Sequence, residues 1–213
     1  MCIGAMTFTP LKTYVRDTWG LLEYPVGWCL RSPQNEEAWP EESLRRFYRS
    51  LGEDARVRAI RIESCEHYQG DVFNLAPSSG IVTFTEAISH IRAFRGELGT
   101  IVLELELRVF ARSKESGPLE MVWVGDRTEG VFSPASQYSQ ARFWFEIGHT
   151  LFRPHSRDGM DNRELARINA PILRGMLERL QQEFGPPSEY EGDGVTSDGF
   201  EPPTPEAKET LDD

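Results

Sequence analysis

The chain has four histidines, the side chains best suited to acid–base chemistry near neutral pH: His67, His90, His149 and His155. His149 and His155, with two aspartates following in the sequence, could supply a general acid or base near a helix end. No nucleophile elbow or glycine-rich phosphate loop accompanies them. A hydrogen-bonded structural role for these two histidines is therefore the competing interpretation.

Two further groups of polar side chains could do chemistry. Cys65 and His67 could share a metal ion, but zinc needs three or four ligands and no second close pair of Cys or His is present. We therefore expect no metal and no cofactor. Glu104 and Glu106 share one face of a predicted strand. They are either an acid–base pair, if one of them is desolvated, or ordinary charges on an exposed sheet face.

An aromatic cluster lies in a segment predicted to be helical. Ser133 and Pro134 have the residue types preferred at the cap and first turn of a helix, and the apolar spacing after them predicts a helix over 135–152. Aromatic side chains at helical spacing either line a ligand pocket or pack in the core. The aromatic residues concerned are Tyr138, Phe143, Trp144 and Phe145.

A helix-then-strand unit appears twice in the chain, with matching apolar residues in each copy. The first copy predicts a helix over 40–51, which begins at Pro40 and ends at Gly52. A strand over 57–63 follows, because its side chains alternate between apolar and charged. The second copy lies 47 positions later in the sequence.

In the second copy, Thr83 and Glu86 have the spacing of a capping box for a helix over 85–98. A strand over 101–109 follows, and 121–124 fits the returning strand of a hairpin. The two units predict an α/β fold with a small mixed sheet covered by helices. If their strands are neighbours, a right-handed crossover would make them parallel.

The last predicted helix begins near Asp161, and its apolar stripe continues to Gly185. Pro171 is expected to kink or split this helix, since proline lacks the amide hydrogen. Beyond it the composition changes to Pro, Gly, Ser, Thr and acidic residues, which cannot form a core. We therefore expect one domain over 1–185 and a disordered acidic tail over 186–213.

Charge and composition exclude several classes of function. Of the net charge of −11, the predicted tail contributes −8, so the rest of the chain is nearly neutral and has no basic face for nucleic acid. No apolar run approaches the roughly 20 residues needed to span a membrane. The absence of a secretory signal and the odd number of cysteines, three, indicate the cytoplasm or nucleus.

Two features favour a protein partner. Phe73 and Leu75 lie in a long loop predicted over 65–79 and could form an exposed apolar patch. Thr204, followed by Pro205, has the order read by proline-directed kinases, and a phosphate there could serve as a docking mark for a basic partner. A solubilising tail with an accidental Thr-Pro pair is the alternative for Thr204.

The segment over 43–62, SLRRFYRSLGEDARVRAIRI, resembles a helix–turn–strand segment of fungal F-box-related and leucine-rich-repeat-like proteins. The F-box itself is not recognisable in residues 1–40, so no role in ubiquitin transfer and no functional residue carries over. The resemblance implies an intracellular α/β region that engages another protein.

These observations favour a non-enzymatic, intracellular protein–protein interaction module with a regulatory or solubilising acidic tail. The alternative is a small enzyme or ligand-binding domain with a pocket near the 135–152 helix, using His149 or His155. The sequence leaves the oligomeric state open.

Overall fold

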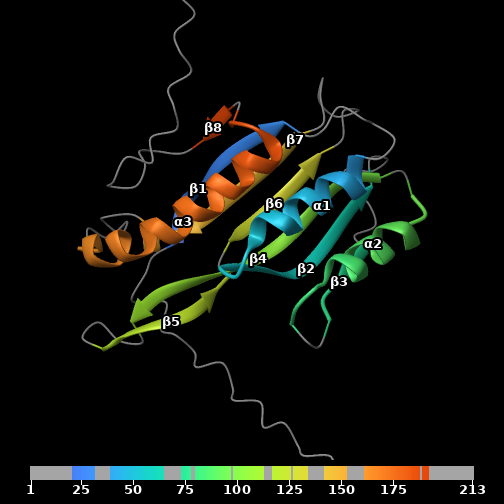
Figure 1. Ribbon diagram of the computed structural model, residues 1–213. Coiled ribbons are helices and arrows are strands. Elements are labelled where there is room, and N and C mark those ends of the chain that lie inside the picture. The colour runs from blue at the N-terminus through green and yellow to red at the C-terminus, as the bar shows by residue number, and fades with distance from the viewer. Residues whose placement is uncertain are drawn as a thin grey trace, which may run out of the picture.

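The computed structural model describes residues 21–31, 39–64, 73–77, 80–96, 98–112, 117–125, 127–133, 142–152, 161–187 and 189–191. They form an eight-stranded sheet with three α-helices packed on one face (Figure 1). The strand order is β3-β2-β4-β6-β7-β1-β8, and β5 pairs with β4 beside β6. The predicted α/β class is confirmed.

The strands are β1 (Leu21–Arg31), β2 (Ala55–Ser64), β3 (Phe73–Leu75), β4 (Leu98–Arg112), β5 (Leu119–Val124), β6 (Thr128–Ser133), β7 (Arg142–His149) and β8 (Glu189–Glu191). The helices are α1 (Trp39–Leu51), α2 (Phe84–Ala93) and α3 (Arg163–Phe184), with a short 3-10 turn over Thr150–Phe152. Among the described residues, no helix is long and apolar enough to cross a bilayer.

The strands of the two predicted units, β2 and β4, are neighbours but run antiparallel, with Val57 opposite Leu105 and Ile60 opposite Leu103. The prediction of a parallel pair is therefore wrong. The cause is β3, which lies inside the predicted 65–79 loop and pairs antiparallel with β2. The chain reverses direction between β2 and β3, and α2 then connects β3 to β4. The parallel strands joined by a crossover are therefore β3 and β4, which lie on either side of β2.

Helix α1 matches its prediction and supplies the centre of the core. Leu44 and Phe47 are fully buried. The ring of Phe47 meets Phe132 of β6 edge-on at 5.8 Å and Phe143 of β7 at 5.1 Å, arrangements that aromatic pairs prefer. Phe143 in turn stacks on Phe184 of α3 at 5.1 Å, so the two helices and the sheet share one aromatic cluster.

The end of α1 is held by α3. Gly52 has a φ of 63°, the left-handed conformation that ends helices, as predicted. Arg179 of α3 donates hydrogen bonds to the carbonyls of Ser50 and Leu51 at 2.8 and 3.2 Å. These carbonyls have no partner within the helix, so the guanidinium completes the cap and ties α1 to α3.

The capping box of α2 is confirmed. The Thr83 hydroxyl accepts from the Glu86 amide at 3.3 Å, and the Glu86 carboxylate accepts from the Thr83 amide at 2.8 Å. The hydrogen bonds from the Thr83 backbone and side chain lower the pKa of Glu86. The helix ends at Ala93 rather than at residue 98, because Phe94 is extended and Leu98 already belongs to β4.

The predicted helix over 135–152 is wrong, because Arg142–His149 forms strand β7. Phe143, Phe145 and Ile147 are buried, while Trp144 and Glu146, which alternate with them, are half-buried. This alternation has the period of two that defines a strand, and aromatic and β-branched residues favour it. The alternation is hard to recognise in the sequence because Trp144, on the second face, makes Phe143, Trp144 and Phe145 one continuous aromatic run, which also fits a helix.

Helix α3 is continuous over 22 residues, although Pro171 was expected to kink or split it. Pro171 is exposed, while Ala170 before it and Leu173 after it are buried, so the apolar stripe continues past the proline. Beyond α3, β8 pairs with β1 inside the range predicted to be a tail. The rest of that range, 192–213, lies outside the described residues.

We expect Thr83→Ala to lower the free energy of unfolding by about 1 kcal/mol, because the substitution removes one half of the capping box. Urea denaturation of the full chain measures this change. Thr85→Ala is the matched control, since Thr85 is exposed inside α2, where alanine favours the helix. Equal losses in both variants would show that the cap contributes nothing specific.

Candidate functional site

The histidines proposed for catalysis do not form a site within the described residues. His149 ends β7 with 1% of its surface exposed, and its ring lies 5.3 Å from that of Phe152. A side chain buried this deeply cannot reach a substrate in solution without a rearrangement of the core. His155 lies outside the described residues, as do Cys65, His67, Tyr138 and Thr204.

The two glutamates of β4 differ in their surroundings. Glu106 is 7% exposed, and the Arg56 guanidinium lies 2.5 Å from its carboxylate, with Arg58 at 4.0 Å. Arg56 also lies over the Trp123 ring at 4.2 Å. Glu104 is half-buried beside Glu129 of β6. Glu106 is therefore the centre of an ion-pair cluster.

Within the described residues, no group of three or more His, Cys, Asp or Glu side chains lies close enough together to hold a metal ion.

The remaining candidates take structural positions where they are described. Phe143 and Phe145 lie fully in the core, which is the packing interpretation of the aromatic cluster. Leu75 is half-buried and packs against the core, and the Phe73 backbone pairs with Ile62. The Phe73 side chain lies outside the described residues, so a patch there stays a prediction.

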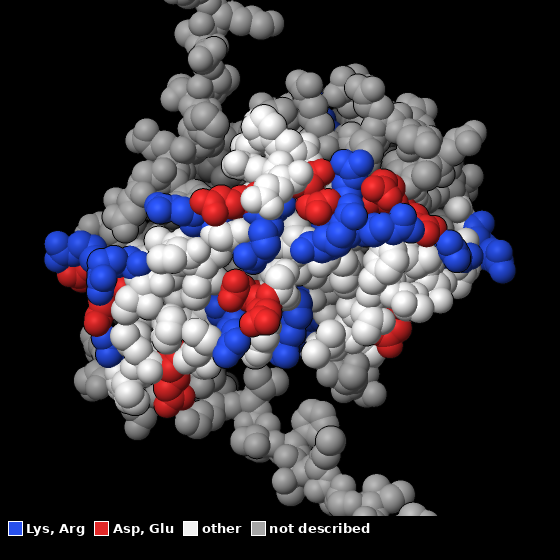
Figure 2. Space-filling view, viewed as in Figure 1, with Lys and Arg blue, Asp and Glu red and all other residues white. Residues whose placement is uncertain are grey.

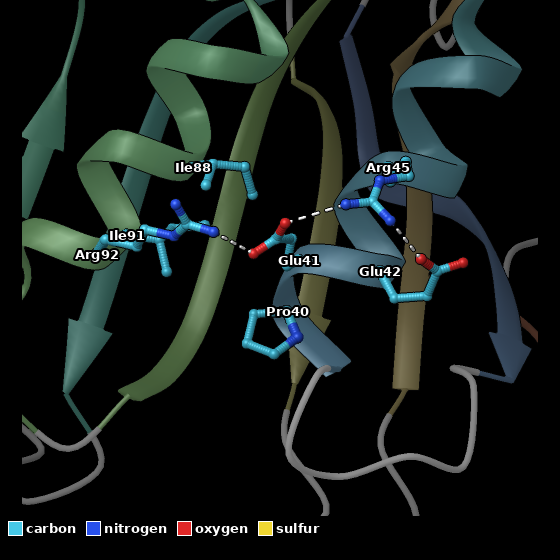
Figure 3. A pocket seen from close by; sticks show the side chains of 7 residues that line it. All are labelled: Pro40, Glu41, Glu42, Arg45, Ile88, Ile91 and Arg92. Carbon is cyan, nitrogen blue, oxygen red and sulfur yellow. Dashed lines mark hydrogen bonds and ion pairs between the residues drawn. The ribbon is translucent and has the colours of Figure 1, made fainter.

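A groove of about 440 Å³ lies between α1 and α2 (Figure 3). It is lined by Pro40, Glu41, Glu42, Arg45, Ile88, Ile91 and Arg92. Pro40 pre-sets the first turn of α1 on one side, and the capping box fixes α2 on the other.

Tyr48 of α1 holds the two helices together beside the groove. Its ring meets Phe84 of α2 at 5.7 Å, and its hydroxyl donates a hydrogen bond to the Val82 carbonyl at 3.0 Å. Burial raises the pKa of this phenol, which therefore stays protonated as a donor.

The apolar part of the groove comes from α2. Ile88 is buried and Ile91 is half-buried against the core. Both side chains face α1, and the Pro40 ring lies near them (Figure 3). An apolar side chain that entered here would be removed from water between two branched residues.

The charged part of the groove is a chain of ion pairs that links the two helices. Arg92 of α2 lies 2.7 Å from Glu41, which also contacts Arg45 at 3.0 Å. Arg45 and Arg46 both contact Glu42, at 3.2 and 3.1 Å. Arg46 does not line the groove, so the lining itself holds two guanidiniums and two carboxylates and is balanced in charge. The wider helix face carries intermixed charges of both signs (Figure 2).

The side chains of the groove offer groups that can bind a ligand. The groove holds no hydroxyl nucleophile, thiol or imidazole among its lining residues. Its exposed guanidiniums can donate paired hydrogen bonds to a carboxylate, and its isoleucines can contact an apolar group. The sequence shows the Glu41–Arg45 and Glu42–Arg46 spacings along one helix. The contact of Glu41 with Arg92, 51 positions away, has no local signal.

We expect His149→Ala to lower the free energy of unfolding by about 2–4 kcal/mol, because truncating a buried ring leaves a cavity. Thermal and urea denaturation of the full chain measure the loss, and His90→Ala, at a half-buried position of α2, is the control. An unchanged melting temperature together with loss of a bound small molecule would instead support the enzyme hypothesis.

Comparison of the chain with protein-family models, with curated proteins and with solved structures gives no match. A function for this chain therefore has to be inferred from its own residues and surfaces.

Proposed function

We propose that this protein is a non-enzymatic protein-interaction module of the cytoplasm or nucleus, and that the α1–α2 groove binds a segment of another protein. The observation that carries the proposal is the pairing of two isoleucines, Ile88 and Ile91, with ion pairs that end in Arg92, a guanidinium on a side chain that is 69% exposed. Interfaces of this kind combine an apolar anchor with a polar rim.

The chemistry of the groove suggests the chemistry of its partner. An apolar side chain would fit between Ile88 and Ile91, and the volume suits one or two side chains rather than a large cofactor. Arg92 has 69% of its side chain exposed, so it can rotate toward a second carboxylate while Arg45 keeps Glu41 paired. The favoured ligand is a peptide segment in which an apolar residue lies close to an aspartate or glutamate.

The acidic C-terminal segment has a separate part in this proposal. Its charge of −8 keeps the chain soluble, and phosphorylation at Thr204 would add further negative charge. A segment with this composition can also compete with an acidic partner for the Arg92 guanidinium. Its role is therefore solubilising or regulatory, and the groove remains the binding element.

We expect Arg92→Glu to abolish capture of the partner, because it places a carboxylate where the ligand carboxylate would bind. The fold should change little, since an exposed ion pair contributes less than about 1 kcal/mol. The measurement is affinity capture with the full chain from its native cells, with quantification of captured proteins by mass spectrometry.

Arg163→Glu is the matched control for this experiment. Arg163 has 71% of its side chain exposed and also forms an ion pair, at 2.6 Å from Asp161, but it lies on α3 away from the groove. A protein that both the wild type and Arg163→Glu capture, and that Arg92→Glu loses, supports the proposal. Identical sets of captured proteins from all three chains contradict it.

A further inference from the structure

Among the described residues, strand β5 is the longest strand of the sheet that has no strand paired along one whole edge. The strands at the two ends of the sheet order, β3 and β8, have three residues each, whereas β5 has six. Within the described part of the chain, β5 pairs only with β4. Figure 1 shows β5 at the margin of the sheet, beyond the end of β6.

The hydrogen bonds of β4 show which backbone groups of β5 face outward. Asn169 of α3 bonds to both the amide and the carbonyl of Phe110, at 2.8 and 2.9 Å, and the Arg108 amide donates to Asp54 at 2.7 Å. These groups of β4 therefore point away from β5. In an antiparallel ladder, two residues that lie opposite each other either both point their backbone groups toward the partner strand or both point them away.

The register extends this conclusion to β5. Phe110 is opposite Met121, Arg108 is opposite Trp123, and Arg112 is opposite Leu119. The N–H and C=O groups of Leu119, Met121 and Trp123 consequently point to the unused edge. The side chains of these three residues are apolar, and Met121 is 44% exposed, one of two large hydrophobic residues exposed to this degree among those described.

Within its six described residues, β5 lacks several of the features that normally prevent pairing. Natural edge strands carry lysine, proline or a bulge, or are very short. The sequence of β5, LEMVWV, contains one charged residue, Glu120, and neither lysine nor proline. Trp123 is also held in place, because Arg56 lies over its ring and is itself paired with Glu106. The edge is thus pre-organised for a further strand.

We propose that β5 pairs with β5 of a second copy of this chain, antiparallel about a two-fold axis at Met121, so that one sheet continues through a dimer. The outward-facing residues are spaced symmetrically about Met121. A two-fold axis there places Met121 opposite Met121 of the second copy, and Leu119 opposite Trp123 of the second copy. All three outward pairs of backbone groups are then matched.

The charges of the strand also suit a second copy. In this register Glu120 lies opposite Val122 of the second copy, so no two carboxylates are directly opposed. Pairing of one short strand buries less than the roughly 1,600 Å² typical of a stable interface. The dimer is therefore weak and forms as the protein concentration rises. It is separate from the α1–α2 groove, and its failure leaves the proposed function untouched.

Sedimentation velocity of the full chain, from micromolar to millimolar concentration at physiological salt, tests the proposal. We expect a concentration-dependent dimer for the wild type and for Ile81→Lys, the control at the other exposed hydrophobic residue, which is 42% exposed. Met121→Lys should stay monomeric, because two ammonium groups would meet at the axis. Met121→Pro should also stay monomeric, because it removes an outward N–H without breaking the β4–β5 ladder.

Mixing the Met121→Lys and Met121→Glu variants provides the register-specific test. Opposite charges at the axis should restore a heterodimer that neither variant forms alone. Circular dichroism confirms that each variant is folded. A wild type that is monomeric at every concentration, dimers of Met121→Lys equal to those of the wild type, or no heterodimer in the mixture would overturn the proposal.

Discussion

Burial of the helix face of β4 is the interaction on which the rest of the structure depends. Its inward side chains are at most 1% exposed: Ile101, Leu103, Leu105, Leu107, Val109 and Ala111. Full burial of a large aliphatic side chain stabilises the fold by about 1.5–3 kcal/mol, so this row is a major part of the core. With 15 residues, β4 is long enough to pair with β2 along one edge and with β6 and then β5 along the other.

The packing of α1 determines where the proposed binding groove lies. Its C-terminal half is tied to α3, since Arg179 caps its last carbonyls and Arg49 lies 2.9 Å from Glu183. Its N-terminal half, with Glu41 and Arg45, is instead free to face α2. The groove therefore lies where exposed ion pairs bridge the two helices at the surface, beside the contact of Tyr48 with Phe84. Side chains at such a place can rearrange around a ligand without loss of the fold.

The two proposed surfaces lie apart on the molecule, with α2 at one side of the sheet and β5 at the other (Figure 1). The second surface is the edge of β5. Asn169 bonds to the backbone of Phe110 on the side of β4 that faces away from β5, so the edge that can be extended there is that of β5. A dimer through β5 would carry two grooves. Two weak sites in one particle bind a repeated or clustered partner more tightly than a single site does.

The sequence by itself determined the local elements. Pro40 and Gly52 bound α1, Thr83 and Glu86 start α2, alternation marks β2 and β4, and a short apolar run marks the end of β5, because these signals act within a few residues. Only the tertiary structure decided that Arg142–His149 is a strand, that β2 and β4 are antiparallel, and that Arg92 meets Glu41 to form the groove. The last two depend on contacts between residues far apart in the chain and leave no local pattern, whereas the alternation of β7 becomes clear only when the buried face of the sheet is known.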